Sequence, residues 1–224
     1  MRDRVAEGRR ENTIINLGVI MEKIDYKKKD KELFNPSAKE ISEVEVPAFN
    51  FIMIDGKGDP GKPGEYSEAI EALYPVAYGI KFHIKKTQGV DYGVMPLEGL
   101  WWAEDFGDYD PEKGNRDNWL WTAMIRQPEF VTKEIFEELL TLTKKKKNLP
   151  ALEKIRFESY KEGKSAQLMH IGPYLAEAPN IMKIHEYIKS HGHKLVGKHH
   201  EIYLGDPRKS APEKLKTVIR QPYI

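Results

Sequence analysis

Cysteine is absent from the 224-residue sequence. This absence excludes disulfide bonds, thiolate zinc sites and cysteine nucleophiles, and it is typical of proteins that fold in a reducing compartment. Long apolar runs are also missing, since no stretch approaches the roughly 20 residues that cross a bilayer. The apolar run from Ile14 to Met21 is interrupted by Asn16 and Gly18 and lacks a small-residue cleavage site, so it does not resemble a signal peptide. We therefore expect a cytoplasmic protein with no membrane partner.

Net charge is nearly absent too, because 36 Lys and Arg residues balance 35 Asp and Glu residues to a formal charge of +1. Such a chain has no strong positive field to attract nucleic acid. The lysine run 144–147 follows a predicted helix and is explained as its solvated end. We expect no nucleic-acid partner. The hydrophobic content of 40% and the aromatic content of 10% are sufficient for a globular core.

The chain contains the order strand, helix, strand, strand twice. Both units close on the same four residues, Ile-Arg-Gln-Pro, at 125–128 and at 219–222. The shared motif and the shared order together indicate an internal duplication. Pro75 lies inside the first apolar helical pattern and predicts an interrupted helix there. The predicted elements are strands at 41–55, 92–104 and 119–128 with a helix at 66–80, then strands at 155–160 and 166–171, a helix ending at Gly192, and strands at 199–206 and 214–224.

These patterns predict an α+β fold made of two pseudo-symmetric strand-helix-strand-strand modules, whose antiparallel sheets form a ligand groove. Residues 1–38 are polar and charged and are expected to be a mobile arm or a short helix. Residues 39–224 then form one domain of two repeats, 39–130 and 151–224. A connector helix at 131–150, with Thr132 as its N-cap, joins the repeats. We expect a monomer or a weak dimer.

Two acids stand inside otherwise apolar predicted strands: Glu98 in MPLEGLWW and Glu201 in HHEIYLGD. The period of two places His199, Glu201 and Tyr203 on one face of their strand, and we expect the opposite face, with Ile202, to meet the helices. We expect both carboxylates to line a shared cleft. A carboxylate beside aromatic rings can hold a cation, or it can act as a general acid or base if its pKa is raised. The alternative is that each acid lies on a solvent-facing or edge strand.

Aromatic residues gather in the strands next to Glu98. Trp102 shares the predicted face of Glu98, so it is the first candidate for a ligand-binding surface. The alternative for each tryptophan is a place in the core, and for a lone histidine in an apolar strand it is a hydrogen-bonded core position. The further candidates for ligand contact are Trp101, Trp119, His170, Tyr174 and Tyr203.

Three other motifs are poor candidates for a site. GKGDPG at 56–61 matches a dinucleotide fingerprint, but Pro60 and Pro63 occupy the place where its helix should begin. The histidines show no zinc-ligand spacing, and the adjacent His199 and His200 should point to opposite faces of a strand. We therefore expect no cofactor and no metal.

The blocks FNPSAKE, FIMIDGKGDP, MPLEGLWW, MIRQPEFVT, MHIGPY and HHEIYLGDPRKSAPEKLKTVIRQP occur in this order. From about Met21 onward the sequence resembles stand-alone GyrI-like small-molecule-binding proteins. The resemblance implies a fold of two modules around a ligand groove. Relatives of this domain include effector-binding domains of multidrug-responsive transcription regulators, in which a groove acid meets lipophilic cations. Other stand-alone relatives hydrolyse the cyclopropane ring of DNA-alkylating natural products.

The resemblance leaves three functions open. The first is binding of a lipophilic aromatic or cationic small molecule, for sequestration or sensing. The second is hydrolysis of a cyclopropane-bearing genotoxin, which would give drug resistance; there Glu201 activates water, Glu98 supports it, and Trp102, Tyr174 and Tyr203 shape the site. The third is inhibition of a protein partner such as gyrase. The sequence does not decide whether the ligand is converted.

Overall fold

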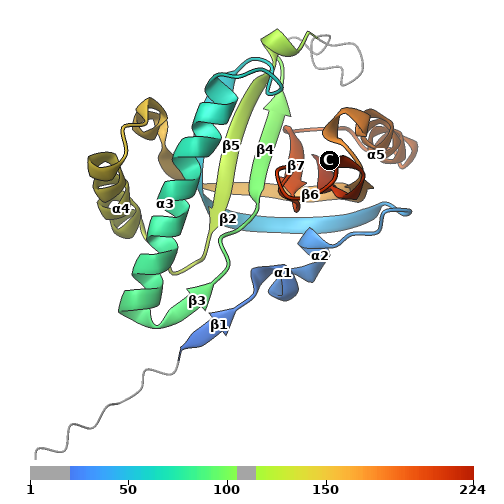
Figure 1. The fold of residues 1–224 in the computed structure, drawn as a ribbon. Helices are drawn as coiled ribbons and strands as arrows, with labels where there is room; N and C mark the ends of the chain where they lie inside the picture. Colours follow the sequence, from blue (N-terminus) through green and yellow to red (C-terminus); the bar gives the residue numbers. More distant parts are fainter. Residues whose placement is uncertain (1–20, 105–114) are drawn as a thin grey trace, which may run out of the picture.

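Six antiparallel strands close into a barrel with the order β2-β5-β4-β7-β8-β6 (Figure 1). The computed structural model describes residues 21–104 and 115–224, so the first 20 residues of the expected arm and most of the turn-rich stretch before Trp119 lie outside the described residues. This closed sheet with helices outside confirms the mixed α and β class. The barrel strands are β2 (Ser42–Lys57), β4 (Leu97–Trp102), β5 (Leu120–Gln127), β6 (Arg156–Ile171), β7 (His199–Tyr203) and β8 (Lys216–Pro222).

Two strand boundaries differ from the sequence prediction. The expected pair 155–160 and 166–171 is one strand, β6, which continues through Gly163 at a φ of 80°. A non-glycine residue would adopt this left-handed conformation only with strain, so glycine lets the strand bend without ending. The expected strand 92–104 is divided into β3 (Val90–Tyr92) and β4. Pro96 lies between them and donates no hydrogen bond.

Helix α3 (Glu65–Gln88) covers the outer face of β2 and β5. Pro75 lies inside it, and the helix is nevertheless continuous, so the predicted interruption is wrong. A proline inside a helix costs about 3 kcal/mol. Seven buried side chains offset this cost by packing against the sheet. They are Ala69, Ala72, Leu73, Val76, Ala77, Ile80 and Ile84.

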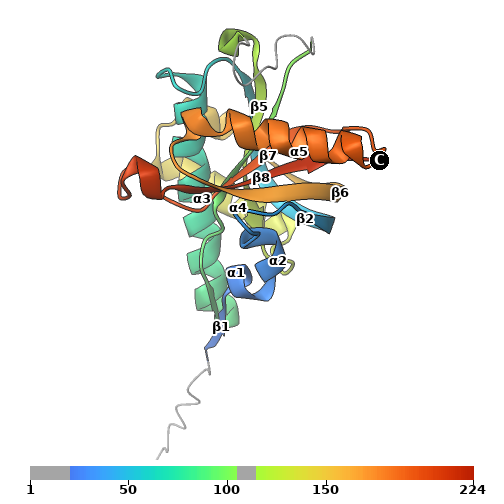
Figure 2. The ribbon, with the colours of Figure 1, turned by 90° about the vertical axis from the view of Figure 1, so that its right-hand side faces the viewer.

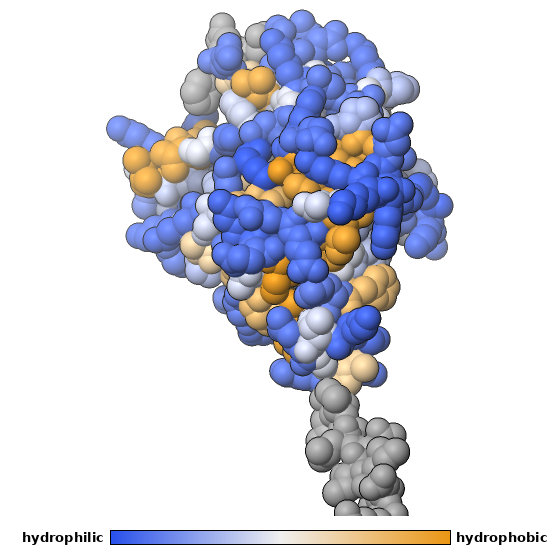
Figure 3. Space-filling model, turned by 90° about the vertical axis from the view of Figure 1, so that its left-hand side faces the viewer, coloured by the Kyte–Doolittle hydropathy of each residue, from blue (hydrophilic) through white to orange (hydrophobic). Residues whose placement is uncertain are grey.

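Helix α4 (Lys133–Lys146) lies within the stretch 131–150 that was expected to be helical. It packs beside α3, and its Phe136 stacks on Phe157 of β6 with ring centroids 5.5 Å apart. The Thr132 side chain accepts a hydrogen bond from the Ile135 backbone N–H, which confirms the predicted N-cap. A short 3-10 helix (Pro150–Lys154) then leads into β6. Figure 3 shows the face that carries α3 and α4, where hydrophilic residues surround smaller hydrophobic areas.

Helix α5 (Ala178–Ser190) crosses the outer face of β6 and β8 (Figure 2). Its isoleucines at 181, 184 and 188 follow the helical period and pack against Ala166, Leu168 and Ile219. The two outer helices therefore cover different parts of the barrel surface. The strand β7 lies next to β8, which α5 covers, and next to β4, which pairs with the strand under α3.

The N-terminal segment from Met21 covers the barrel interior. Strand β1 (Glu22–Ile24) pairs in parallel with β3, and the short helices α1 (Tyr26–Lys29) and α2 (Lys31–Phe34) follow it. Leu33 and Phe34 are buried against Val46, Ile202 and Val218 on the inner barrel face. None of the helices in the described ranges is both long and apolar enough to cross a membrane.

Candidate ligand site

The strand register places Glu98 and Glu201 on opposite faces of the barrel sheet. Gly99 is opposite Glu201 across the β4–β7 pair, and Glu98 is opposite Ile202. Glu201 therefore points outward with Tyr203, as the period of two predicts, while Glu98 points inward. The expectation that the two acids line one cleft is wrong. The Ile202 face was expected to meet the helices of the repeats, but Ile202 is buried inside the barrel against Leu33 and Phe34 of the short helix α2.

The duplicated motif explains the error. Ile125 of the first IRQP motif pairs with Leu97, whereas Ile219 of the second pairs with Glu201. The residue paired with the isoleucine of the first motif, as Glu201 is with that of the second, is therefore Leu97, one residue away from Glu98. A shift of one residue moves a side chain to the other face of a sheet.

Glu201 is held by its neighbours on the outer face of β7. His199 Nε2 lies 3.1 Å from Glu201 Oε1, and the Tyr203 hydroxyl donates to Glu201 Oε2 at 2.7 Å. Trp101 Nε1 donates in turn to the Tyr203 oxygen at 3.1 Å. Burial alone would raise the pKa of Glu201, but the hydrogen bonds from His199 and Tyr203 and the electrostatic interaction with His199 outweigh it and lower this pKa.

Glu177 completes the site, and the sequence analysis did not single it out. It immediately precedes α5, is 3% exposed, and its carboxyl group is electrostatically coupled to that of Glu201. Burial and then the charge of Glu201 raise the pKa of Glu177 far above that of an ordinary carboxyl. These opposite shifts favour one proton on the pair at neutral pH, held by Glu177, with the negative charge on Glu201. Because Glu177 follows a 3-10 turn (Tyr174–Ala176), no strand or helix period in the sequence indicated its direction.

Aromatic rings surround this carboxyl pair. Tyr174 packs edge-on against Tyr203 with ring centroids 5.3 Å apart. Tyr66, from the first turn of α3, lies 5.1 Å from the ring of Trp101 and 5.0 Å from that of Trp121. Burial raises the pKa of Tyr66, so it stays a neutral phenol. Of the residues expected to bind ligand, Trp101, Tyr174 and Tyr203 thus lie together, and Tyr66 joins them from a helix start that gave no signal.

Of the other predicted ligand contacts, Trp102 lies on the opposite face of the sheet from Glu201. Trp119 and His170 pack around the residues that form the site. Trp102 lies on the Glu98 face of β4, where Lys198 Nζ is 3.3 Å from the centre of its ring. Trp119 is 8% exposed and packs edge-on against Trp101 at 6.1 Å. His170 is buried, with Nε2 3.2 Å from the Pro173 carbonyl and Nδ1 3.0 Å from Asn180 Nδ2. His170 therefore stabilises the turn that carries Tyr174 and Glu177.

Glu98 belongs to a second polar cluster inside the barrel. His200 Nε2 lies 2.9 Å from Glu98 Oε2, and His200 Nδ1 lies 3.0 Å from Glu162 Oε2. Arg220 donates to the same Glu162 oxygen at 3.0 Å and to the Leu33 carbonyl at 2.8 Å. A cavity of about 20 Å³ beside them has room for about one water molecule.

The pKa shifts of this cluster indicate that Glu162 forms ion pairs with both His200 and Arg220. Burial opposes charge on both Glu162 and His200, but the charges of His200 and Arg220 lower the pKa of Glu162 to about 2. The charge of Glu162 and the hydrogen bonds to Glu162 and Glu98 raise the pKa of His200 to about 9. The cluster therefore ties β4, β6, β7 and β8 to the N-terminal segment. Within residues 21–104 and 115–224, no three His, Asp or Glu side chains are grouped to hold a metal ion.

Small-molecule sites are lined mostly by apolar and aromatic side chains with a few polar groups among them, and the acid pair with its surrounding rings on the outer face of β7 has this composition. The chain belongs to the GyrI-like family: the model of the GyrI-like small molecule binding domain matches residues 39–223. The search of curated proteins found no match.

Solved structures agree with this assignment. The chain is 38% identical to an uncharacterized conserved protein from Listeria innocua, with a TM-score of 0.81 and coverage of 90% of this chain and 100% of the other. It is 39% identical to a hydrolase from Listeria innocua, with a TM-score of 0.78 and coverage of 91% and 100%. The EcmrR C-terminal domain shares the fold alone, at 12% identity, a TM-score of 0.52 and coverage of 83% and 97%.

Proposed function

We propose that this protein is a hydrolase that binds a lipophilic aromatic molecule beside Tyr174 and Trp101 and adds water to it. The observation that carries the proposal is the electrostatic coupling of the Glu177 and Glu201 carboxyl groups, which shifts their pKa values in opposite directions. Two carboxyls held in different protonation states can supply a general acid and a general base at the same pH. Glu201 is the base, and Glu177 is the acid.

The substrate class that best fits this pair is a strained electrophilic ring conjugated to a carbonyl, such as the cyclopropane of DNA alkylators. Glu201 accepts a proton from water while the water oxygen forms a bond to the ring carbon. The strained carbon–carbon bond breaks, and its electron pair moves to the carbonyl oxygen, which takes the proton of Glu177. Glu201 then returns its proton to Glu177, which restores both groups. The balance is substrate plus one water molecule.

The surroundings of the pair support this chemistry. His199 and Tyr203 hold the Glu201 carboxylate by both oxygens, at 3.1 and 2.7 Å, so its direction is fixed before substrate binds. The partly exposed rings of Tyr66 and Tyr174 offer surfaces to a planar ligand, and the buried Trp101 supports them from below through Tyr66 and Tyr203. The Listeria innocua hydrolase that is 39% identical over nearly the whole chain adds support.

A second candidate is binding of a lipophilic cation without turnover. The pair carries one negative charge when it shares one proton, and it lies beside electron-rich rings that attract cations. In that case the protein would sequester or sense its ligand. Binding without any change in the mass of the ligand separates this candidate from the hydrolase.

We also propose that the domain arose by duplication of one module, with repeats at 39–130 and 151–224. The two IRQP motifs support this, because both arginines reach the N-terminal segment. Arg126 pairs with Asp30 at 2.7 Å, and Arg220 donates to the Leu33 carbonyl at 2.8 Å. The two isoleucines instead face outward, Ile125 towards the α3 core and Ile219 towards the α5 core.

The deciding experiment is incubation of the purified protein with a cyclopropane-bearing DNA alkylator, following tryptophan fluorescence and the mass of the compound. We expect quenching, because Trp101 lies in the site, and a product heavier by one water. Glu201→Gln should still quench but form no product, whereas Glu186→Gln, on the exposed side of α5, should behave as wild type. Quenching at constant mass would favour the binding protein, and equal turnover by Glu201→Gln would contradict the assigned base.

A further inference from the structure

A row of three paired side chains crosses the outer face of the barrel next to Glu201. Thr217 of β8 pairs with Tyr203 of β7 on one side and with His170 of β6 on the other. Because Ile219, two residues further along β8, packs under α5, the period of two directs the Thr217 side chain outward as well. Thr217 has an exposed fraction of 0%. A buried hydroxyl group therefore lies between a tyrosine of the site and a histidine that supports it.

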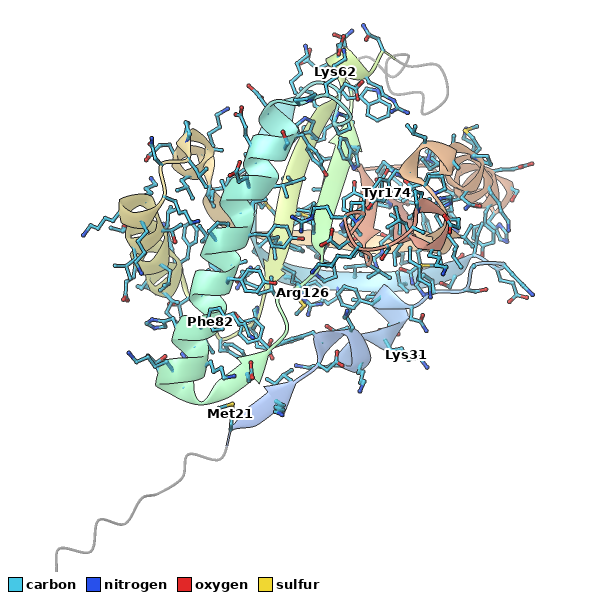
Figure 4. The ribbon with its side chains drawn as sticks, in the orientation of Figure 1. Met21, Lys31, Lys62, Phe82, Arg126 and Tyr174 are labelled. Carbon is cyan, nitrogen blue, oxygen red and sulfur yellow. The ribbon has the colours of Figure 1, made fainter. Side chains whose placement is uncertain are left out.

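The turn that carries Glu177 is fixed over this row. His170 Nδ1 lies 3.0 Å from Asn180 Nδ2, and the Asn180 backbone N–H donates to the Glu177 carbonyl at 2.9 Å. At the other end of the turn, the ring of Tyr174 packs against that of Tyr203. Figure 4 shows Tyr174 beside strand β7 and the start of α5. The middle of the row therefore lies beneath Glu177.

Two buried polar atoms at this place have no direct partner. Among the described residues, neither Thr217 Oγ1 nor Glu177 Oε1 forms a hydrogen bond. Burial and then the charge of Glu201 raise the pKa of Glu177, and Thr217 acts in the opposite direction, so the two side chains are close enough to interact. Buried polar atoms that lack a protein partner are usually bonded to an ordered water molecule. The arrangement is therefore that of a site for one water.

Glu201 lies within reach of the same water. It is opposite Ile219 across the β7–β8 pair, which makes it the diagonal neighbour of Thr217. Diagonal neighbours on one face of a sheet are about 7–8 Å apart, a span that a carboxylate, a water molecule and a hydroxyl group can fill. Each Glu201 oxygen has one bond, to His199 or to Tyr203, and a carboxylate oxygen can accept a second. The Glu201 side chain is 14% exposed, so it borders both the buried water and the open site.

We propose that Thr217 holds the water molecule that Glu201 activates, with Glu177 as the third partner of this water. The inference rests on the proposed function and deepens it, because it assigns the place from which the attacking oxygen comes. The Thr217 hydroxyl donates to the water oxygen, and the two O–H groups of the water point to Glu177 Oε1 and to Glu201. One lone pair of the water then remains for the substrate.

This geometry fits the chemistry of the proposed reaction. Glu201 takes one proton of the bound water while the water oxygen forms its bond to the strained ring carbon. The electron pair of the broken carbon–carbon bond moves to the carbonyl oxygen of the substrate, which takes the proton of Glu177. Thr217 keeps its proton throughout, so its contribution is to fix the position of the attacking oxygen.

Thr217→Val and Thr217→Ser separate this role from a structural one. Valine keeps the shape of threonine without the hydroxyl group, whereas serine keeps the hydroxyl group. With a cyclopropane-bearing DNA alkylator, we expect Thr217→Val to lower kcat about 10²-fold, since a misplaced reactant costs about this factor. The Kd from tryptophan quenching should not change, and Thr217→Ser should retain most of the turnover. Thr143→Val is the matched control, because Thr143 is a buried threonine of α4 whose hydroxyl donates to the Leu139 carbonyl.

A crystal structure that shows ordered water tests the same inference without a substrate. We expect one water within hydrogen-bond distance of Thr217 Oγ1, Glu177 Oε1 and a Glu201 oxygen in wild type, and no water there in Thr217→Val. Wild-type turnover by Thr217→Val, equal losses in the valine and serine variants, or a direct bond between Thr217 and Glu177 would overturn the inference while the proposed hydrolase stands. If wild type itself leaves the alkylator unchanged, the proposed function fails, and the catalytic role of this water fails with it.

Discussion

His199 and His200 are adjacent in sequence, but they serve opposite faces of strand β7. His199 Nε2 lies 3.1 Å from Glu201 on the outer face, whereas His200 bridges Glu98 and Glu162 inside the barrel at 2.9 and 3.0 Å. The pair therefore joins two different polar clusters through one peptide unit. We propose a catalytic role for the outer cluster and expect the inner cluster to stabilise the fold. Substitutions in the outer cluster should therefore change turnover, and those in the inner cluster should change the free energy of unfolding.

Glu177→Gln tests the outer cluster. Glutamine resembles the protonated carboxyl in shape but cannot give up a proton, so we expect turnover of a cyclopropane-bearing alkylator to fall about 10²-fold or more. Binding should remain, because the charge of the site at neutral pH is unchanged. Single-turnover kinetics with a mass readout measures the first effect, and tryptophan quenching measures the second. Turnover at the wild-type rate would remove Glu177 from the acid role.

Arg220→Met tests the inner cluster. Arg220 is 2% exposed and binds Glu162, Gln167 and the Leu33 carbonyl. Removing one member of a buried charge network leaves its partner uncompensated, so we expect the free energy of unfolding to fall by about 3–5 kcal/mol. Urea denaturation measures this change. Arg208→Ala, at a side chain 82% exposed, should change stability by less than about 0.5 kcal/mol, and similar losses in both variants would contradict the network.

The pH dependence of stability isolates His200. Its folded pKa of about 9 exceeds its ordinary value of 6.5, so the charged imidazolium stabilises the fold. That contribution is fully present below about pH 6.5 and is lost as the pH rises to about 9. We expect the free energy of unfolding of wild type to fall relative to His200→Gln across this range, by on the order of 3 kcal/mol. Urea titrations at several pH values between 6 and 9.5 measure the difference, and parallel curves would show that His200 is neutral in the folded protein.

The sequence predicted those features that follow from the regular alternation of side chains along a strand or around a helix. The face shared by His199, Glu201 and Tyr203 follows from the alternation of a strand, and the structure confirms it. The family follows from the motifs, and the family model confirms it. The relation of Glu98 to Glu201 could not be derived in the same way, because it depends on the register between two strands. That register is set by pairing and packing.

Two further features depended on tertiary structure alone. Glu177 lies where a turn meets a helix, and only the packing of α5 against the barrel brings it to Glu201. The helix around Pro75 is continuous because burial of one face outweighs the missing hydrogen bond. The helix-breaking tendency of proline predicts a break at Pro75 from the local sequence. Packing of the helix against the sheet depends on residues far away in the sequence, and it outweighs that tendency.

Gly99→Ala tests how closely the site is packed. Gly99 lies opposite Glu201 in the β4–β7 pair, and a Cβ added to it would lie 2.7 Å from Trp101 Nε1 and 3.0 Å from the Tyr203 hydroxyl oxygen. These atoms form the hydrogen bond that holds Tyr203, so the methyl group must displace one of them. We expect a loss of about 1–3 kcal/mol in the free energy of unfolding and a larger fractional loss of turnover than of binding, because Tyr203 orients Glu201. Gly93→Ala is the matched control, since a Cβ there meets no atom within 4 Å. If Gly99→Ala behaved like Gly93→Ala in denaturation and in turnover, the contact between Trp101 and Tyr203 would have no part in positioning the carboxylate.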